Sequence, residues 1–154
     1  MNNTYQLVPY THENYDFVYE VKKNAYKKYV EEYWGTWNDK EQQIRFKSSI
    51  DRNKNYTYII IYENKKIGFY QGKLINKDTY YIENICIVPE YQRKGIGTKI
   101  LSDIIEKYKE YNIEIQYFKQ NPVGKLYERL GFIPIGETEY HYQMIKPKQE
   151  ILKK

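Results

Sequence analysis

A short glycine-containing loop is the part of this sequence best suited to chemistry. Residues 82–98 read IENICIVPEYQRKGIGT, an apolar strand followed by Gly95 and Gly97 at the start of a helix. The first turn of a helix has backbone N–H groups without partners and the positive end of the helix dipole, and glycine lets a phosphate approach the backbone. Because Arg93 and Lys94 add positive charge, the loop is suited to a pyrophosphate.

Two other phosphate-binding patterns do not fit this loop. A dinucleotide-binding G-x-G-x-x-G would need a small residue where this chain has Ile100, and a P-loop would need Gly-Lys-Ser/Thr where it has Gly97-Thr98-Lys99. An isolated G-x-G is usually explained by glycines that tighten a strand-to-helix turn. Assigning a function therefore requires a second, independent block of residues.

Two blocks together resemble the GNAT superfamily of N-acetyltransferases. The first is Q-x-x-G-x-G at residues 92–97, preceded by Ile-Val-Pro-Glu-Tyr at residues 87–91, and it is similar to the acetyl-CoA motif of that family. The second, residues 121–132, reads NPVGKLYERLGF and is similar to the family's N-x-x-A-x-x-L-Y-E-x-L-G-F segment, at the expected distance downstream. The order of the predicted elements extends the resemblance over nearly the whole chain.

The resemblance implies a site for acetyl-CoA as the cosubstrate. The backbone around Ile85 and Ile87 would pair like a strand with pantetheine, where the fourth and fifth strands of such a fold splay apart. The loop would surround the pyrophosphate, and Asn121 would hydrogen-bond the pantetheine arm. Gly124 replaces the family's usual Ala, which leaves room for the cofactor at a cost of about 1 kcal/mol in helix propensity. The implied cofactor-binding residues are Ile85, Cys86, Ile87, Gln92, Arg93, Lys94, Gly95, Ile96, Gly97, Thr98, Asn121, Gly124 and Tyr127.

Acetyl transfer to an amine needs a catalytic acid and an oxyanion donor. The departing thiolate must be protonated, and the tetrahedral oxyanion must be stabilised. Tyr127 stands where the resemblance implies the tyrosine whose hydroxyl faces the CoA sulfur, so we predict that it is the general acid. A backbone N–H near Ile87 would donate a hydrogen bond to the oxyanion.

Glu83 is the predicted general base. Its side chain alternates to the same side of the strand as Ile87, from where it would accept a proton through water. The resemblance leaves other positions open, because many relatives have the acid two residues earlier, at Tyr81 here, and others take it from the next strand. There, Gln116 holds the corresponding position and Glu114 is its same-face neighbour. A glutamate on the solvent side of a strand is an equally good interpretation of Glu83.

An aromatic loop, residues 34–37, lies where the resemblance implies the cover of the acceptor site. Trp34 and Trp37 would suit an amine through cation–π contact, and Glu31 or Glu32 would attract its charge. Core packing is the commoner fate of tryptophan, so both interpretations stay open.

The periodicity of apolar residues predicts a mixed-sheet α/β protein in the order β-α-α-β-β-β-α-β-α-β-β. For such a protein, the resemblance implies a GNAT-like acyl-CoA N-acyltransferase fold. Gly35 ends the first helix, and Asn38 or Asp39 caps the second. A strand, helix, strand crossover predicts one parallel pair. The predicted strands are 5–9, 56–62, 67–75, 79–88, 113–118, 132–135 and 140–145, and the predicted helices are 12–33, 38–50, 95–109 and 122–130.

Composition limits the classes of partner. The 154 residues fit a single domain, predicted over 1–146, with a charged tail at 147–154. No signal peptide or roughly 18-residue apolar span is apparent, so we expect a cytoplasmic protein without a membrane partner. Cys86 with His12 and His141 makes no metal-ligand spacing, and Cys86 suits a core position. The net charge is +5, but acidic residues are interleaved with basic ones, so neither metal nor nucleic acid is expected.

These features predict a cytoplasmic N-acetyltransferase. It would move the acetyl group of acetyl-CoA directly onto a primary amine of a small molecule or peptide, as a monomer or homodimer. The alternative is a catalytically silent module that binds CoA as a regulatory ligand.

Overall fold

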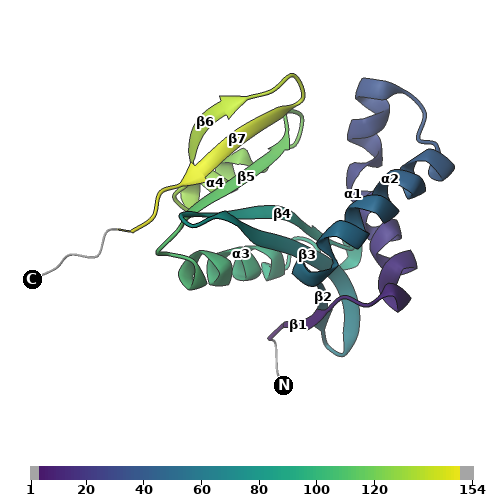
Figure 1. The fold of residues 1–154 in the computed structure, drawn as a ribbon, viewed down its shortest axis with the longest axis horizontal. Helices are drawn as coiled ribbons and strands as arrows, with labels where there is room; N and C mark the ends of the chain where they lie inside the picture. Colours follow the sequence, from purple (N-terminus) through teal and green to yellow (C-terminus); the bar gives the residue numbers. More distant parts are fainter. Residues whose placement is uncertain (1–3, 150–154) are drawn as a thin grey trace, which may run out of the picture. The chain divides into compact units, whose positions relative to one another are not determined.

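The computed structural model describes residues 4–149 and has the predicted order of elements (Figure 1). Its seven strands form one mixed sheet in the order β1-β2-β3-β4-β5-β7-β6, which confirms the predicted fold class. The strands are β1 (Gln6–Pro9), β2 (Thr57–Tyr62), β3 (Lys65–Asn76), β4 (Thr79–Ile87), β5 (Asn112–Phe118), β6 (Ile133–Glu137) and β7 (His141–Lys146). The helices are α1 (Tyr15–Trp34), α2 (Asp39–Asn53), α3 (Ile96–Lys107) and α4 (Gly124–Arg129), with 3₁₀ turns η1 (His12–Asn14), η2 (Lys54–Tyr56) and η3 (Pro89–Tyr91).

The chain divides into two compact units. The N-terminal unit comprises the residues up to Gln71 together with Asn84–Gly97. The C-terminal unit comprises Gly72–Glu83 and the residues from Thr98 onward. The single domain expected from the sequence stays a prediction. No helix in residues 4–149 is long and apolar enough to cross a membrane.

In the N-terminal unit, α1 and α2 cover the strands with a shared apolar core. Both helices contribute rings as well as aliphatic side chains, since Tyr19 of α1 and Phe46 of α2 lie 6.1 Å apart between ring centroids. This core removes the apolar faces of both helices from water, which is the main source of their stability. Its buried residues are Val18, Tyr19, Val21, Trp37, Phe46, Ile50, Ile59, Phe69 and Cys86.

The ends of these helices follow the predicted capping residues. α1 ends before Gly35, whose φ of 90° lies in the region that favours glycine. Asn38 caps α2, because its side-chain oxygen accepts a hydrogen bond from the N–H of Glu41 at 3.0 Å. The predicted start of the first helix is corrected slightly, since residues 12–14 form the 3₁₀ turn that leads into α1.

A chain of buried hydrogen bonds crosses the same core. Tyr26 of α1 donates to Asn84 Oδ1 at 2.7 Å, Asn84 Nδ2 donates to Gln71 Oε1 at 2.6 Å, and Gln71 Nε2 donates to Thr57 Oγ1 at 3.0 Å. The Thr57 hydroxyl donates in turn to the carbonyl of Asn53 at 2.7 Å. Within residues 4–149, every buried side-chain nitrogen and oxygen has a partner. This series of hydrogen bonds therefore links α1 to β2, β3 and β4 and leaves none of its side-chain polar groups unpaired.

The C-terminal unit is built around β5. β4 pairs with β5 in parallel over four residue pairs, the last of them Ile82 with Ile115, although β4 continues to Ile87 and β5 to Phe118. The predicted parallel and partial pairing is thus confirmed. On its other side β5 pairs antiparallel with β7 along its length, from Ile113 onward.

Helix α3 and two tyrosine rings complete this unit. The side chains of Ile100, Leu101 and Ile104 are buried. The ring of Tyr80 on β4 stacks on that of Tyr108, just after α3, with centroids 3.7 Å apart. Apolar residues of the amphipathic helix thus face inward, as the sequence periodicity predicts.

The end of the chain contains the hairpin of β6 and β7 and a short tail. The antiparallel register of this predicted hairpin shifts between Pro134 and Gly136. Beyond β7, the backbone N–H of Lys148 donates to Asn112 Oδ1, and that of Gln149 donates to the carbonyl of Lys109, both at 2.9 Å. Residues 150–154 of the predicted tail lie outside the described residues.

Gly68 allows β3 to approach the backbone of β4, and its replacement tests that contact. A Cβ at this buried position would collide with the carbonyl oxygen of Cys86. Gly68→Ala should lower the free energy of unfolding by about 1–3 kcal/mol, measured by urea denaturation. In the control Gly136→Ala, the new Cβ meets only the flexible end of Gln143 at 3.2 Å, so the change should stay within about 0.5 kcal/mol. Equal effects of both variants would contradict this account.

Candidate active site

The loop between β4 and α3 has an open backbone geometry that can receive an anion. Arg93 and Gly95 both have left-handed φ angles, 61° and 82°. Residues 92–95 are exposed, and among residues 4–149 no heavy atom other than those of Gly95 and its two chain neighbours lies within 4 Å of the place where a Cβ of Gly95 would stand. α3 begins immediately afterwards at Ile96, so the first N–H groups of the helix lack partners within it. Loops of this kind form concave sites for phosphate.

Gln92 attaches this loop to the end of β4. Its Nε2 donates to the carbonyl of Ile87 at 2.7 Å. A Cβ on Gly97 would stand 3.4 Å from Cδ1 of the same isoleucine, so the helix start also lies close to the strand. Lys94 Nζ lies 5.2 Å from the centroid of the Tyr91 ring. Gln92 thus positions the loop, while Arg93 and Lys94 supply its charge.

The residues of β4 alternate between two faces as predicted. Ile85 and Ile87 are half-buried and Glu83 is exposed, whereas Asn84 and Cys86 are buried on the opposite face. Burial raises the pKa of the Cys86 thiol to about 11, although a hydrogen bond with a tyrosine hydroxyl acts in the other direction. The interpretation of Cys86 as a core residue is therefore confirmed for its side chain, and only its backbone is available to a ligand.

In the C-terminal unit, Tyr127 lies in a cluster of aromatic rings. Its ring centroid is 5.5 Å from that of Tyr117 and 5.8 Å from that of Phe132. A Cβ on Gly124 would collide with the hydroxyl of Tyr117. Tyr117 thus explains why glycine stands where the resemblance implies alanine, a cause that sequence spacing did not reveal.

Asn121 forms the turn that precedes α4. Its Oδ1 accepts a hydrogen bond from the N–H of Val123 at 3.1 Å, an arrangement typical of an Asx turn. The side-chain NH₂ group takes no part in this turn. α4 consequently begins at Gly124, two residues later than the predicted start at Pro122.

Tyr81, Glu83 and Glu114 form an acidic cluster in the same unit. Tyr81 is paired with Glu114 across the parallel ladder. Burial raises the pKa of Tyr81 to about 12, and the negative charges of Glu83 and Glu114 act in the same direction. Tyr81, Glu114 and Gln116 line a cavity of about 100 Å³. The structure therefore brings together the residues among which sequence reasoning left the base undecided.

The predicted site residues fall into two groups. Those of the N-terminal unit are Ile85, Cys86, Ile87, Gln92, Arg93, Lys94, Gly95, Ile96 and Gly97. Those of the C-terminal unit are Glu83, Thr98, Asn121, Gly124 and Tyr127. In the part of the chain that the structure describes, no three His, Cys, Asp or Glu side chains gather as a metal site would require.

The two tryptophans do not form a pair of walls around an amine. Trp37 is buried in the core, where its Nε1 donates to Tyr19 Oη at 3.1 Å and to Asp39 Oδ1 at 3.2 Å. Its backbone N–H donates to Glu31 Oε2 at 3.0 Å, so that carboxylate has a structural partner. The side chain of Trp34 is 53% exposed. Most of the Trp37 side chain is thus packed in the core.

Comparisons with known proteins agree with this geometry. The family model described as "Acetyltransferase (GNAT) family" matches residues 22–132. A search of curated protein sequences finds no significant match.

Solved structures resemble the whole chain at low sequence identity. An acetyltransferase from Thermus thermophilus has a TM-score of 0.74 at 15% identity, covering 96% of this chain and 99% of that one. The PaiA N-acetyltransferase from Thermoplasma acidophilum, solved in complex with coenzyme A, has a TM-score of 0.69 at 19% identity, covering 94% and 99%. An N-acetyltransferase from Staphylococcus aureus has a TM-score of 0.70 at 17% identity, covering 91% and 99%. At these identities the likeness is one of fold.

Burial of Cys86 predicts that its thiol is unreactive in the folded protein. Only the thiolate is nucleophilic, and a pKa near 11 leaves very little of it at pH 8. The thiol reagent DTNB at pH 8 should therefore react with the chain only after urea is added, with free N-acetylcysteine as the positive control. Complete reaction of the folded protein within the time the control needs would contradict the assigned burial.

Proposed function

The chain belongs to the acetyltransferase (GNAT) family, and from that membership we propose that it transfers the acetyl group of acetyl-CoA to a primary amine. The observation that carries this proposal is the loop at residues 92–97, where left-handed backbone at Arg93 and Gly95 leads into the start of α3. A structure of similar fold was solved with coenzyme A, which supports a CoA ester as the acetyl donor.

The residues of the loop fit the pyrophosphate of acetyl-CoA. Gly95 presents open backbone, the first N–H groups of α3 point out of the helix end, and Arg93 and Lys94 supply charge. Thr98, exposed in the first turn of α3, adds a hydroxyl donor. The hydrogen bond from Gln92 Nε2 to the carbonyl of Ile87 keeps the loop in this position. When bound, acetyl-CoA supplies the activated acetyl group.

The pantetheine arm would be held by backbone groups of β4 and by Asn121. Ile85 and Ile87 follow Ile82, the last residue of β4 that pairs with β5, so backbone groups beyond that point would pair with the arm as a strand does. The carbonyl of Ile87 is not one of them, because it accepts the hydrogen bond from Gln92. The side-chain oxygen of Asn121 accepts a hydrogen bond in the turn before α4, and its NH₂ group would donate to a carbonyl of the ligand. Within the C-terminal unit, Gly124 leaves room for the hydroxyl of Tyr117 beside α4.

We assign the proton transfers to Tyr127 and to the acidic cluster. Tyr127, held against the rings of Tyr117 and Phe132, would protonate the departing thiolate. Glu83 would take the proton of the amine, directly or through water, and Glu114 is the alternative. Two carboxylates around Tyr81 also attract a cationic acceptor, because opposite charges lower the energy of its approach.

Binding of acetyl-CoA tests the loop. Acetyl-CoA should raise the melting temperature, because a ligand at 100 times its Kd stabilises the folded state by about 2.7 kcal/mol. Gly95→Val should abolish the shift, since it blocks the phosphate approach and strains the positive φ. Gly35→Val is the matched control, because Gly35 also has a positive φ and open surroundings but lies after α1. If Gly95→Val and Gly35→Val retain equal shifts, the loop does not hold the phosphates.

Turnover tests the acid. Tyr127→Phe should lower kcat by roughly 10²- to 10⁴-fold with little change in acetyl-CoA affinity, because only the hydroxyl is removed. The control is Tyr117→Phe, which removes the neighbouring hydroxyl and should leave kcat within about fivefold. Thiol release would be followed against a panel of a polyamine, an aminoglycoside, amino acids and a peptide with a free N-terminus. Wild-type turnover by Tyr127→Phe would exclude Tyr127 as the acid.

The same assay separates the two candidate bases and the silent-module alternative. Of Glu83→Gln and Glu114→Gln, the variant lacking the base should lose turnover at neutral pH and recover part of it at higher pH, where more acceptor amine is neutral. Tyr127→Phe should show no such recovery. Binding of acetyl-CoA without thiol release for any amine would favour a module that binds CoA as a regulatory ligand.

A further inference from the structure

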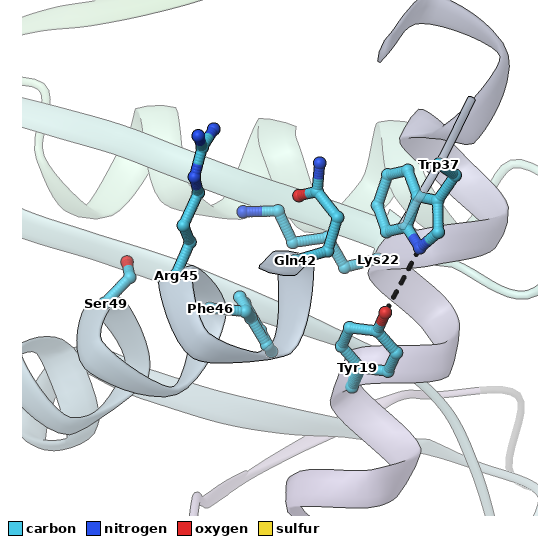
Figure 2. A pocket seen from close by; sticks show the side chains of 7 residues that line it. All are labelled: Tyr19, Lys22, Trp37, Gln42, Arg45, Phe46 and Ser49. Carbon is cyan, nitrogen blue, oxygen red and sulfur yellow. Dashed lines mark hydrogen bonds between the residues drawn. The ribbon is translucent and has the colours of Figure 1, made fainter. Parts of the chain in front are cut away.

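A second cavity lies in the N-terminal unit, between α1 and α2, and no step of acetyl transfer uses it. Figure 2 shows the side chains that line it, and its volume is about 250 Å³. Three aromatic side chains form its walls: Tyr19 of α1, Phe46 of α2 and Trp37, just before α2. Sites for drug-sized ligands are typically about 300–1,000 Å³, so an occupant of this cavity would be a smaller molecule.

Hydrogen bonds hold two of the aromatic walls, Tyr19 and Trp37, in place. Trp37 Nε1 donates to Tyr19 Oη at 3.1 Å, the bond drawn in Figure 2. Tyr19 Oη donates in turn to Asp39 Oδ1 at 2.7 Å. Lys23 holds the same Asp39 carboxylate at 2.9 Å. Burial and the bond to Asp39 raise the pKa of Tyr19 to about 12, so its hydroxyl stays a donor at neutral pH. Because the polar atoms of both rings are paired, the walls present mainly carbon to a ligand.

The rim of the cavity carries hydrogen-bond donors and two positive charges. Gln42 and Arg45 extend from α2 in the same direction, and Lys22 reaches toward them from α1 (Figure 2). Lys22 Nζ lies 4.8 Å from the centroid of the Phe46 ring. Ser49 adds a hydroxyl one turn further along α2. No acidic residue lines the cavity in the part of the chain that the structure describes, so the charged side chains of its lining, Lys22 and Arg45, are both positive.

Arg45 gives the rim its chemical preference. Within residues 4–149, no carboxylate lies within 4.0 Å of its guanidinium group as an ion-pair partner. A guanidinium group presents a planar fork of N–H donors that matches a carboxylate or phosphate with two parallel hydrogen bonds. A cationic amine would be repelled here. The cavity therefore differs in charge from the acidic cluster assigned to the acceptor.

We propose that this cavity binds a small molecule in which a carboxylate or phosphate is attached to a flat apolar body. Arg45 and Lys22 hold the anion, and Gln42 and Ser49 donate to its remaining oxygens. The flat body packs against the rings of Trp37 and the other walls, where stacking adds to the burial of apolar surface. This proposal does not depend on the transfer chemistry proposed above.

Fluorescence of Trp37 tests this proposal without any enzyme assay. The chain has two tryptophans, so Trp34→Phe leaves Trp37 as the single emitter. Phenylacetate and phenyl phosphate should each change its emission with saturation, whereas uncharged phenylacetamide should bind at least about tenfold more weakly because it lacks the charge-assisted bonds. Saturation by only one of the two anions would identify the anion that the site takes. Equal binding of phenylacetamide would overturn the anion site.

Matched charge variants of α2 locate the anion. In the Trp34→Phe background, Arg45→Gln should weaken binding of the anionic probe by roughly tenfold, and Lys40→Gln, which removes the same charge from an exposed position, by less than about twofold. Thermal melting would show that both variants are folded. For the parent protein, a higher NaCl concentration should weaken binding of the anionic probe, since salt screens exposed charges. Equal loss in both variants, or no salt dependence, would overturn the assignment.

Discussion

The hydrogen bonds that run from Thr57 through Gln71 and Asn84 to Tyr26 constrain the register of the strands in the N-terminal unit. Apolar packing tolerates small displacements, but amide groups buried in a sheet have specific partners. A one-residue slip of β3 or β4 would leave these groups unpaired, at about 1–3 kcal/mol each. The chain of bonds therefore selects one register, and that register decides which side chains of β4 face inward.

The same constraint extends to the loop that carries the proposed phosphate site. With Asn84 held inward, alternation places Ile85 and Ile87 on the opposite face. Beyond the strand, the N–H of Val88 donates to the carbonyl of Ile67 at 2.8 Å, and Gln92 returns to Ile87. Each contact fixes the next few residues, so the left-handed turn begins from a strand end that is already positioned. The buried side chain of Asn84 thus helps to position the exposed loop at residues 92–95.

Sequence reasoning predicted the elements well because each carries its own signal. Apolar periodicity, Gly35 after the first helix and Asn38 before the second all report local structure, and the glycine loop reports a local backbone geometry. The position of β7 between β5 and β6 has no such signal, since pairing across the sheet depends on residues far apart in the chain. For the same reason the contact of Gly124 with Tyr117, and the gathering of cations around the cavity between α1 and α2, became visible only in the structure.

β6, one of the two edge strands of the sheet, affects how copies of this chain behave at high concentration. An open strand edge is a template on which another chain can add a strand, and Ile133 and Ile135 make this edge apolar, each being 51% exposed. Pro134 offers no N–H to an incoming strand, and the register shift between Pro134 and Gly136 breaks the regular spacing of donors and acceptors. The edge therefore resists growth into continuous intermolecular sheet, and the protein tolerates exposed isoleucines that a flat, regular strand would turn into a point of aggregation.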